Sequence, residues 1–525
     1  MNAVQAEFAQ AAITVRNPAT QEIVGRLPIF SAAEIAVAVE RAGAAQERWA
    51  KTHIGNRLKI IRRFQSLLCE QKDAVAAVIT REAGKPLAES MATEVLLVLD
   101  AAEYLLKNAA EFLLPEPIPH SNPVMKLKKG MLLREPYGVI GIISPWNYPF
   151  SLPSIQTLTA LVTGNAVVLK PSEFTPLSSL ELQRLLREAA LDHDLMQVVT
   201  GEGPAGGALL QANIGKMVFT GSVATGRKVA QSAAAKLLPV LLELGGKDPM
   251  IVLEDADVNV ASSAAVWGAF MNSGQTCLSV ERCYVHESVY QKFLDACVAK
   301  AGRLRQGRGD EGTTDIGPMI HEKQLNVVQR HVDDAIAHGA RLLLGGKSAP
   351  GLGPNFFQPT ILADVTHEMD IMQEETFGPV LPVCSFNSDD DAVALANDSE
   401  FGLAASIWTR DKRRGEALAR RIHAGTVMVN DVVACFGISE APHGGVKSSG
   451  IGRTHGRYGL EEMVWPKYVD SDRMPGMKKL WWYGYGTAFQ QQMSGYIELL
   501  FAKNLINRIR GAVKSTRSFL LHRPR

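Results

Sequence analysis

Residues 164–173 read GNAVVLKPSE, and this stretch predicts how the chain is built. Its centre, Ala166–Lys170 (AVVLK), is short, apolar and rich in valine, as expected for a strand buried on both faces. A helical pattern follows over Pro176–Leu191. A buried strand that leads into a helix is the repeating unit of a parallel α/β sheet.

The same alternation continues on both sides of this stretch. Further elements are expected at Tyr137–Ser144, Gln197–Thr200 and Met217–Thr220 as strands, and at 157–163, Gly206–Ala212 and 223–236 as helices. The alternation of strands and helices resumes after residue 245 and continues to about residue 455. We therefore expect an α/β fold with two parallel domains that divide near Gly245–Gly246.

The segment before these units is predicted to be mainly helical, over residues 31–112. Ser31 and Glu34 have the spacing of a capping box, in which each side chain satisfies a backbone N–H at the start of a helix. Several prolines then interrupt the pattern, and 116–136 is expected to be a loop that leads into an extended segment.

Composition and charge exclude several classes of protein. Of the 525 residues, 46% are hydrophobic and 21% are charged, so the chain can bury a large core and global disorder is not expected. The formal net charge of +1 gives no basis for nucleic-acid binding. The six cysteines are scattered without C-x-x-C spacing, so neither a metal site nor a disulfide framework is expected.

Targeting signals are not evident in the sequence. Residues 1–15 include Glu7 and lack a basic region, unlike a secretory signal. No stretch reaches the roughly 18 uninterrupted apolar residues that indicate a spanning helix. A cytoplasmic protein is the expectation.

Two glycine-rich turns have features of nucleotide-binding loops. GEGPAGG at 201–207 contains G-x-G-x-x-G, with Gly203 as its second glycine, but lacks the acidic residue expected about 20 positions later. GSVATG at 221–226 opens a helix, and the N–H groups that follow Gly221 and Ser222 favour a phosphate. An ordinary turn between a strand and a helix is the alternative for each.

Lys170 and Glu173 form a further candidate pair for binding a nucleotide. Lys170 ends a buried strand, at the sheet edge where ligands of α/β proteins bind, and it could reach a ribose or a phosphate. Glu173 could accept hydrogen bonds from ribose hydroxyls and would repel a 2′-phosphate. A plain helix start explains Glu173 equally well.

Cys277, in NSGQTCLSVER (272–282), is the candidate nucleophile. A thiol reacts once its pKa falls or a base takes its proton, and the preceding turn Gly274–Thr276 can direct backbone amides towards it. The other cysteines lie in apolar or helical runs that fit core packing, which is also the alternative for Cys277.

Glu243 and Asn147 are the candidate base and oxyanion donor. Glu243 closes the apolar run PVLLEL (239–244), where a partly desolvated carboxylate suits general-base work. Asn147 lies between Trp146 and Tyr148 with prolines on both sides, so its amide would be rigidly held. A strand-end glutamate and a turn asparagine are the alternatives. Together these groups indicate attack on a carbonyl carbon beside a dinucleotide.

Seven motifs in this order and spacing resemble those of the NAD(P)-dependent aldehyde dehydrogenase superfamily, over about Asn17–Tyr468. They are PWNYPF (145–150), GNAVVLKPSE (164–173), FTGS (219–222), LELGGKDP (242–249), GQTC (274–277), EETFGPV (374–380) and GVKSSGIGR (445–453).

The resemblance implies a mechanism. Cys277 would attack the aldehyde to give a thiohemiacetal, whose oxyanion is held by the Asn147 side chain and the Cys277 amide. Hydride would pass to the nicotinamide and leave a thioester. Glu243 would then activate the water that releases the free acid.

The resemblance also implies NAD as the cofactor, with NADP possible, held by Trp146, Lys170, Glu173, Gly203, Gly221, Ser222, Glu375 and Phe377. Lys170 and Glu375 would hold ribose hydroxyls, and Ser222 and Trp146 would lie near the pyrophosphate. Phe377 would pack by the nicotinamide, and the turn with Gly203 would line the adenine side. Glu173 would bind the adenosine ribose, which favours NAD.

The family fold implies three parts in addition to a tail. These are an NAD-binding domain (1–116 and 138–245), a catalytic domain (246–456) and a small β oligomerisation arm (117–137 and 457–471). The arm would join subunits into a homodimer or a homotetramer.

The tail, residues 472–525, is basic and amphipathic. From Met474 onward there are nine Lys/Arg and one Glu, a net of +8, which leaves −7 for the preceding residues. Ile497, Phe501, Leu505 and Ile509 form one stripe at helical spacing, and aromatic residues lie upstream at 481–485. The pattern predicts binding to a membrane surface, with packing against a neighbouring subunit as the alternative.

A tail on a bilayer would suit a hydrophobic aldehyde substrate, either long-chain or terpenoid. LWWYGYG (480–486) is also similar to the C-terminal region of the bacterial diapolycopene-dial (carotenoid aldehyde) dehydrogenase-like group. One alternative is a small polar semialdehyde, which would need cationic side chains near the substrate. A non-catalytic NAD-binding scaffold would require the loss of a catalytic residue, and none is lost.

Overall fold

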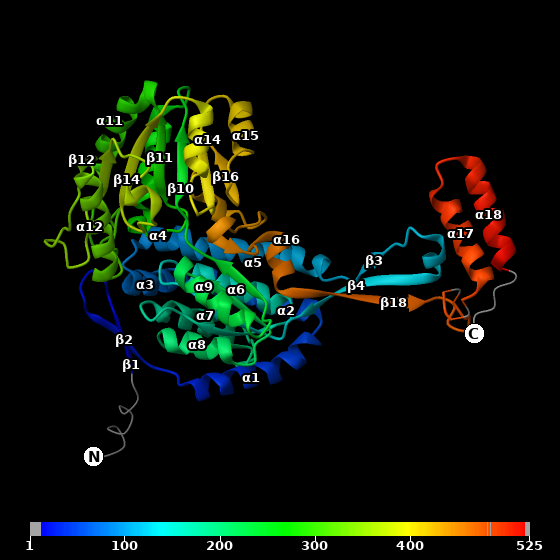
Figure 1. Cartoon of the computed structure of the whole chain (residues 1–525). Coiled ribbons are helices and arrows are strands. Elements are labelled where there is room, and N and C mark those ends of the chain that lie inside the picture. The colour runs from blue at the N-terminus through cyan, green and yellow to red at the C-terminus, as the bar shows by residue number, and fades with distance from the viewer. Residues whose placement is uncertain (1–11, 480, 484, 520–525) are drawn as a thin grey trace, which may run out of the picture. The chain divides into compact units, whose positions relative to one another are not determined.

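A computed structural model of the chain describes residues 12–479, 481–483 and 485–519 (Figure 1). The first sheet has six strands in the order β17-β9-β8-β5-β6-β7, and all neighbours are parallel except β17 and β9. The strands are β5 (Val139–Ile143), β6 (Ala166–Lys170), β7 (Met196–Val198), β8 (Lys216–Thr220), β9 (Val240–Glu243) and β17 (Gly450–Ile451).

The connecting helices confirm the alternation predicted from the sequence. They are α6 (Ser151–Val162), α7 (Pro176–Glu188), α8 (Gly203–Gln211) and α9 (Val223–Ala234). The strand predicted at Ala166–Lys170 is present with those bounds and is buried throughout. The helix predicted from Gly206 begins three residues earlier, because Pro204 is well tolerated in a first helical turn.

The second sheet has seven strands in the order β12-β13-β14-β11-β10-β15-β16, parallel except for β12. Its strands are β10 (Asp248–Val252), β11 (Val280–His286), β12 (Arg341–Leu344), β13 (Thr360–Ala363), β14 (Val380–Phe386), β15 (Ala404–Trp408) and β16 (Thr426–Val429). Its helices are α10 (Val258–Phe270), α11 (Tyr290–Ala301), α12 (Glu322–Ala337), α13 (Asp370–Gln373), α14 (Asp389–Asn397) and α15 (Lys412–Ala419). Gly245–Gly246 lie between the last residue of β9 and the first of β10.

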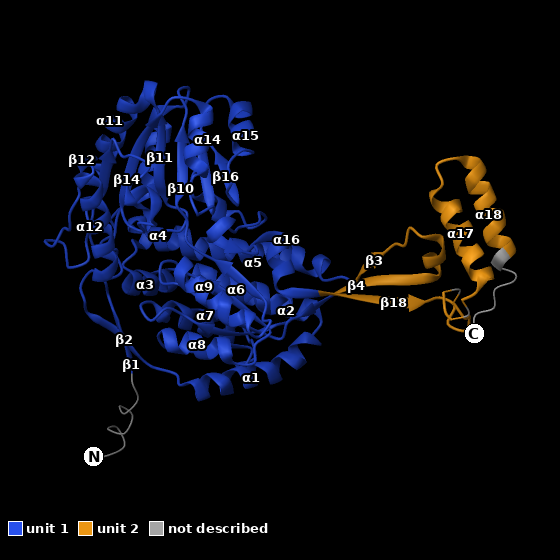
Figure 2. Cartoon of the chain, viewed as in Figure 1, with its two compact units in different colours: residues 1–114, 134–465 blue, residues 115–133, 466–525 orange. Residues whose placement is uncertain are grey.

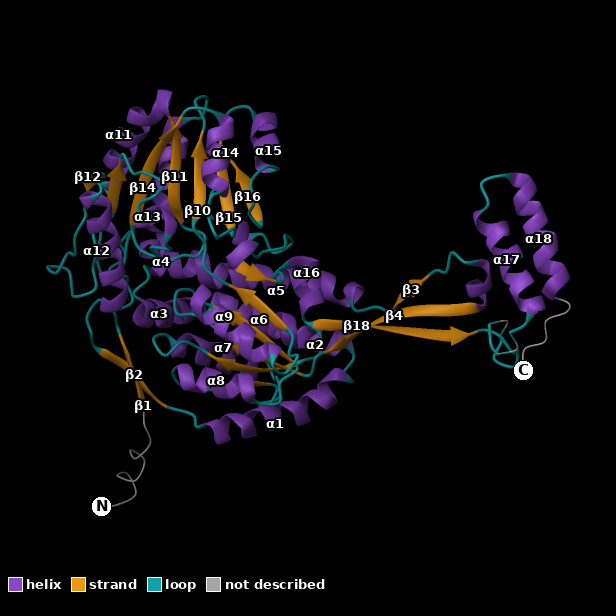
Figure 3. Cartoon of the chain, in the orientation of Figure 1, coloured by secondary structure: helices purple, strands orange, loops and turns teal. Residues whose placement is uncertain are grey.

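The predicted helical segment near the N-terminus is confirmed. It follows the hairpin of β1 (Ala12–Arg16) and β2 (Ile23–Pro28) and contains α1 (Ala32–Ala50), α2 (Ile54–Glu70), α3 (Lys72–Ala83), α4 (Leu87–Ser90) and α5 (Leu96–Phe112). Ser31 and Glu34 form the predicted capping box at α1. Figure 3 shows that helices flank both sheets.

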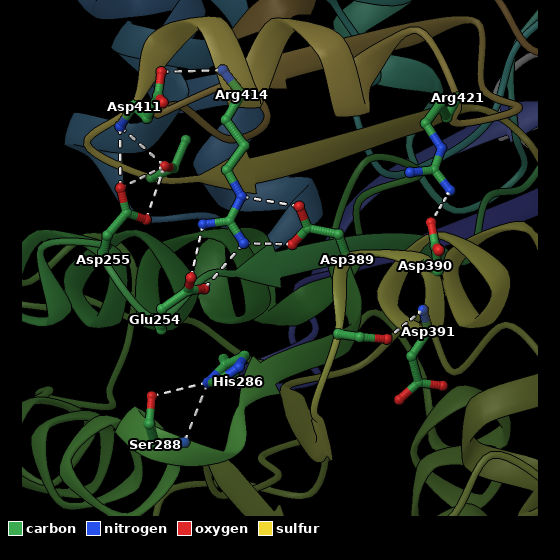
Figure 4. A network of polar contacts seen from close by, with 12 residues as sticks. Glu254, Asp255, His286, Ser288, Asp389, Asp390, Asp391, Asp411, Arg414 and Arg421 are labelled. Carbon is green, nitrogen blue, oxygen red and sulfur yellow. Dashed lines mark hydrogen bonds and ion pairs between the residues drawn. The ribbon is translucent and has the colours of Figure 1, made fainter.

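Charged side chains fasten the loops at the carboxyl ends of β10 and β15 (Figure 4). The Arg414 guanidinium donates to Glu254, with Nη1 to Oε1 at 2.8 Å, and to Asp389, with Nε to Oδ2 at 2.9 Å. Asp255 accepts from the Thr409 hydroxyl at 2.8 Å. The two hydrogen-bonded carboxylates raise the pKa of Arg414, so the guanidinium stays charged. Its hydrogen bonds hold these loops together.

The chain forms two compact units, residues 1–114 with 134–465 and residues 115–133 with 466–525 (Figure 2). The second unit therefore contains the predicted tail and part of the predicted arm. Helix α16 (Gly456–Glu462), which the prediction gave to the arm, packs against α5 and α6 in the first unit because Leu460 is buried there. The predictions for residues 1–11 and 520–525 lie outside the described residues.

A small sheet, most of whose residues belong to the second unit, has the order β18-β4-β3. Its strands are β3 (Glu116–Ile118), β4 (Lys128–Pro136) and β18 (Val464–Asp472), so the segment predicted as a loop at 116–136 holds two strands. No helix in the described part of the chain is long and apolar enough to cross a bilayer. No cluster of three or more potential metal ligands occurs among the described residues.

The tail forms two helices, α17 (Thr487–Phe501) and α18 (Leu505–Phe519), so the prediction of one helical stripe from Ile497 to Ile509 was wrong. The helix breaks because the Asn504 side chain accepts from the backbone N–H groups of Ile506 at 2.6 Å and Asn507 at 3.3 Å. Such a cap begins a new helix and does not extend the old one.

Candidate active site

A pocket of about 250 Å³ opens at the carboxyl ends of the first sheet's strands. It brings together the three predicted catalytic residues, Asn147, Glu243 and Cys277. Five predicted cofactor residues also line it, namely Trp146, Gly221, Ser222, Glu375 and Phe377. Residues from β8, from β9 and from the loops that follow β5 and precede β11 and β14 thus meet at one edge of a parallel sheet, where α/β proteins bind ligands.

Cys277 follows a sharply turned segment of backbone. Asn272, Ser273 and Gly274 have φ values of 49°, 57° and 70°, which is the left-handed region. The Cys277 backbone N–H donates to no group within the described part of the chain. Burial raises the pKa of the Cys277 thiol well above its ordinary value, as do the carboxylates of Glu243, Asp248 and Glu375. The turn therefore presents a protonated thiol and an available amide to the pocket.

Asn147 is tied to the loop that carries Cys277. Its Nδ2 donates to the Gln275 carbonyl oxygen at 3.0 Å, and Asn272 Nδ2 donates to the Asn147 carbonyl oxygen at 3.0 Å. An amide nitrogen has two hydrogens, so one N–H of Asn147 remains for a ligand in the pocket.

Buried charges hold the segment around Asn147 in place. Glu94 Oε2 accepts from the backbone N–H of Ser151 at 2.7 Å, at the start of α6. Lys85 Nζ lies 2.7 Å from Glu94 Oε1 and 3.8 Å from the centre of the Tyr148 ring. The Tyr148 hydroxyl lies 2.8 Å from Thr276 Oγ1. A continuous chain of contacts thus fixes Asn147 relative to Cys277.

Glu243 is the last residue of β9 and is 5% exposed. Its Oε2 lies 3.2 Å from His443 Nε2, a residue that the sequence analysis did not single out. Its Oε1 has no hydrogen-bond partner among the described residues. The carboxylate therefore keeps one oxygen in contact with the imidazole and one available for a proton from the pocket.

Glu375 and Phe377 lie on a loop that a buried ion pair orders. Glu281 pairs with Lys247 at 2.6 Å and accepts from the Phe377 backbone N–H at 2.8 Å. Glu375 Oε1 accepts from the Gly246 N–H at 3.2 Å. Burial, reinforced by the Glu281 carboxylate, raises the pKa of Glu375 to about 8. Glu375 therefore holds a proton more readily than an exposed carboxyl does.

One end of the pocket has features suited to a dinucleotide. Gly221 and Ser222 precede the N-terminus of α9, and the Ser222 hydroxyl caps that helix. The Trp146 and Phe377 rings lie 5.4 Å apart, edge to face. Backbone N–H groups at a helix start favour phosphate, and aromatic rings favour a nicotinamide. The donor set present here fits this class of cofactor.

Three predicted cofactor residues, Lys170, Glu173 and Gly203, do not line this pocket. Lys170 Nζ lies 3.6 Å from Glu173 Oε2, and burial lowers the lysine's pKa. A Cβ added at Gly206 would lie 3.9 Å from Lys170 Cδ, which places the start of α8 beside Lys170. These residues form a separate group beyond the pocket lining.

Two residues that order the site, His443 and Glu281, were not predicted from the sequence. A signal for His443 was present, because it lies two residues before the GVKSSGIGR motif and is followed directly by two glycines. The sequence around Glu281 gives no comparable indication, because a single glutamate in a β-type run is usually an exposed side chain.

Comparisons with known proteins agree with this geometry. The model of the aldehyde dehydrogenase family matches residues 5–469. The chain belongs to the aldehyde dehydrogenase family. It is an NAD(P)-dependent aldehyde oxidoreductase with the α/β fold of that family, as the resemblance implied.

Two curated relatives of this aldehyde dehydrogenase differ in their named substrates. The 4,4'-diapolycopene aldehyde oxidase of Methylomonas sp. is 38% identical over 494 residues, which are 94% of this chain and 92% of that protein. A putative succinate-semialdehyde dehydrogenase [NADP(+)] of Mycolicibacterium smegmatis is 39% identical over 449 residues, 85% of this chain and 86% of that protein.

A solved structure shares the fold. The crystal structure of Mycobacterium tuberculosis aldehyde dehydrogenase complexed with NAD+ has a TM-score of 0.84 and 36% identity, and the match covers 88% of this chain and 95% of that one.

Proposed function

We propose that this aldehyde dehydrogenase oxidises a hydrophobic aldehyde to its carboxylic acid, with Cys277 as the nucleophile, Glu243 as the general base and Asn147 as an oxyanion donor. The main support for these three roles is the way their side chains meet in one pocket. The three side chains open into one pocket, and each offers an uncommitted group there, namely the Cys277 thiol, Glu243 Oε1 and the second N–H of Asn147.

The first step forms a bond between Cys277 Sγ and the aldehyde carbon. The thiol proton passes to water in the pocket, and the negative charge moves to the former carbonyl oxygen. The Asn147 amide and the Cys277 backbone N–H then donate to that oxygen. Fixed donors of this kind are worth about 10²–10³ in rate each.

The second step is release of the acid. The dinucleotide, which Trp146, Gly221, Ser222 and Phe377 would hold, would supply the hydride acceptor that leaves a thioester on Cys277. Glu243 takes a proton from a water molecule. The water oxygen bonds to the thioester carbon, and the carbon–sulfur bond breaks with its electrons on Sγ.

The nucleophile is tested by replacing Cys277 with Ala. We expect NADH formation to fall below detection while NAD binding, followed by quenching of tryptophan fluorescence, is retained. Cys69→Ala is the matched control, because Cys69 is an exposed thiol of the same unit. Substantial turnover by Cys277→Ala would refute the assignment.

We propose that NAD is preferred over NADP, through Glu173. Its carboxylate lies within 3.6 Å of the Lys170 ammonium, where it partly cancels the cation that would attract a 2′-phosphate. We expect Glu173→Gln to lower the ratio of kcat/KM for NAD over NADP by about 10-fold. Glu181→Gln, a surface substitution on α7, is the control and should leave the ratio unchanged.

A hydrophobic substrate is supported by the pocket lining, which contains no lysine, arginine or histidine among the described residues. A carboxylated semialdehyde would need such a cation, whereas an uncharged aldehyde packs against Leu152 and Leu244 at no electrostatic cost. The match to the Methylomonas protein also spans 494 residues, more than the family model's 5–469, and so continues into the tail.

The tail hairpin has its apolar residues outside. At the crossing of α17 and α18, a Cβ on Gly495 would lie 2.7 Å from the Gly511 carbonyl oxygen, so the two backbones touch. Lys514 Nζ contacts Ser494 and Glu498 across the same interface. The exposed residues include Ile497, Phe501, Leu505, Ile506, Ile509 and Val513. A helix pair with polar contacts inside and apolar residues outside needs an apolar partner.

We propose that this partner is the surface of an anionic bilayer, so that the cytoplasmic enzyme docks peripherally. Four cations, Lys503, Arg508, Arg510 and Arg517, are exposed on or beside the same helices, against the single acid Glu498. Each basic residue near an anionic surface contributes about 1 kcal/mol. A bilayer would also dissolve the proposed substrate.

Flotation of the full chain with phosphatidylcholine vesicles, with and without phosphatidylglycerol, tests the docking. We expect binding that requires the anionic lipid and is lost in Phe501→Ser/Leu505→Ser. Leu237→Ser, at a 90% exposed leucine of the first unit, is the matched control. If the full chain does not float, and the double variant forms a smaller oligomer than the wild type by light scattering, then the hairpin packs against a second copy of the chain.

We also propose a homodimer or homotetramer formed through the small sheet β18-β4-β3. Its strand β18 is largely exposed, and Tyr468 and Val469 are among its exposed residues. A three-stranded sheet with so little cover is suited to packing against a second copy. Light scattering of Tyr468→Ser/Val469→Ser should report a monomer.

NADH formation across an aldehyde series tests the substrate class. We expect kcat/KM to rise from acetaldehyde to long-chain and polyenyl aldehydes. A preference for succinic semialdehyde would overturn the hydrophobic assignment and leave the catalytic one intact.

A further inference from the structure

His443 is a buried histidine in direct contact with the proposed general base. Its Nε2 lies 3.2 Å from Glu243 Oε2, and the two side chains are 4% and 6% exposed. It is held from both sides, because its backbone pairs with Thr454 as an isolated β-bridge and the Phe436 ring packs edge-on at 5.0 Å. The imidazole therefore cannot turn away from the carboxylate without local unfolding.

The groups around His443 determine its charge. Burial alone would lower the pKa of His443, but the Glu243 carboxylate and Cys435 outweigh it and raise that pKa to about 10. His455, whose ring lies 5.7 Å away, has a pKa lowered to about 3 by burial and by His443. One imidazolium and one neutral imidazole thus share this space. The Arg453 guanidinium donates hydrogen bonds to the carbonyl oxygens of Gly445 and Gly452.

The contact determines which oxygen of Glu243 can accept a proton. Oε2 accepts from His443, whereas Oε1 has no partner among the described residues and lies close to Gly444, where an added Cβ would be 2.8 Å from it. A carboxylate that must take a proton from water needs one oxygen aimed at the water and a second interaction to stop the group from rotating. His443 provides that second interaction.

We propose that His443 is the positioning residue of the general base, holding Glu243 through Oε2 so that Oε1 faces the thioester-bound water. The inference rests on the proposed function of Glu243. His443 itself does not touch the reacting atoms.

The role is tested on deacylation alone, without cofactor. p-Nitrophenyl acetate acetylates Cys277, since Sγ bonds to the acetyl carbon and p-nitrophenolate leaves with the electrons of the broken C–O bond. Hydrolysis of the acetyl-enzyme then requires the water that Glu243 activates. Stopped-flow absorbance gives the acylation burst and the steady state separately, and intact mass shows the acetyl-enzyme.

We expect His443→Phe to lower the steady-state rate by about 10²-fold and to accumulate the acetyl-enzyme, with the burst rate within about threefold of the wild type. His443→Gln keeps an N–H donor without the charge, and should recover part of this loss. In His443→Gln, the acid limb of the steady-state rate should move to higher pH. His367→Gln is the matched control, because His367 pairs with Asp398 at 3.1 Å outside the pocket.

The outcomes separate the two proposals. If Glu243→Gln deacylates slowly but both His443 variants deacylate like the wild type, His443 is not a positioning residue. If Glu243→Gln itself deacylates normally, the proposed base is wrong. If His443 were only structural, its variants would lower the burst rate and the steady-state rate together. The acid limb of the steady-state rate against pH would then stay where it is in the wild type. That result would also overturn the inference.

Discussion

The side-chain nitrogen of Asn147 lies 3.0 Å from the carbonyl oxygen of Gln275, two residues before Cys277. The two loops come from different sheets, and this hydrogen bond joins them at the pocket. Because the carbonyl uses one N–H and fixes the plane of the amide, the direction of the other N–H is set before any substrate arrives. Such preorganisation is what makes an oxyanion donor effective.

Replacing Asn147 with Ala should therefore lower kcat/KM by about 10²–10³. Steady-state NADH formation measures the change, and the melting temperature should fall by only a few degrees. Asn108→Ala is the control, since Asn108 makes a similar amide-to-carbonyl hydrogen bond, to Tyr104, on the exposed face of α5. An Asn147→Ala enzyme of nearly normal kcat/KM would remove this residue from the oxyanion site.

Glu243→Gln should make Cys277 more reactive towards an alkylating agent even though aldehyde oxidation is lost. After burial, the Glu243 carboxylate is the largest cause of the raised pKa of Cys277. Removing its charge lowers that pKa and increases the thiolate fraction at a given pH. Iodoacetamide labelling of the cofactor-free enzyme from pH 7 to 10, followed at the Cys277 peptide, measures the midpoint. A midpoint that stays or rises would contradict the electrostatic coupling.

Lys85→Met should destabilise the protein by about 3–5 kcal/mol, because it leaves the buried Glu94 carboxylate without its cation. Urea unfolding gives the free energy. Lys107→Met breaks the exposed pair with Glu103 and should change stability by less than about 1 kcal/mol. Equal effects of the two substitutions would show that burial of the Lys85–Glu94 pair does not matter.

Gly246→Ala should impair catalysis with little effect on folding. A Cβ at this position would lie 2.5 Å from the Cys277 carbonyl oxygen, so the backbone that carries the nucleophile must shift. A displacement near 1 Å can cost about 10²-fold in rate. Gly207→Ala is the control, because nothing lies within 4 Å of its added Cβ and alanine favours the α8 helix by about 0.5–1 kcal/mol. Unchanged kcat in Gly246→Ala would place the nucleophile on a more adaptable loop.

His443 should make stability depend on pH in a definite window. Its folded pKa of about 10 exceeds the ordinary 6.5, so the folded state binds the proton more tightly. The stabilisation is therefore complete below pH 6.5 and declines as the pH rises towards 10. The difference in unfolding free energy between the wild type and His443→Gln should shrink over that range. A constant difference would show that the histidine is not charged in the folded protein.

Local sequence patterns predicted the first sheet well, because its strands are buried on both faces and read as continuous apolar runs. Ala166–Lys170 is the clearest case, with bounds that the structure reproduces. The prediction of one helical stripe in the tail was wrong, because the residue that caps the second helix does not interrupt the apolar spacing. The apolar residues of the tail repeat at helical spacing through Ala502–Asn504, and only the Asn504 side chain, hydrogen-bonded to the next turn, reveals the break.

The predicted catalytic residues stand out because their neighbours in sequence are unusual, as with the prolines around Asn147 or the glycines after Glu243. His443 depends on a contact with a residue 200 positions earlier, and no local pattern encodes that distance. The same limit applies to Glu281, whose importance arises from the loop at 375–377 that it caps.

The strand that carries Glu243 is completed from a distant part of the chain. β17 pairs antiparallel with β9, with Gly450 opposite Glu243. On the ribosome, β9 must therefore wait at the open edge of its sheet until residues 450–451 have been made. During that interval the proposed nucleophile, Cys277, already exists, but the strand that ends in the proposed base, Glu243, lacks its outer partner. A chain that ends before residue 450 would leave the edge of β9, with Glu243 at its end, unpaired.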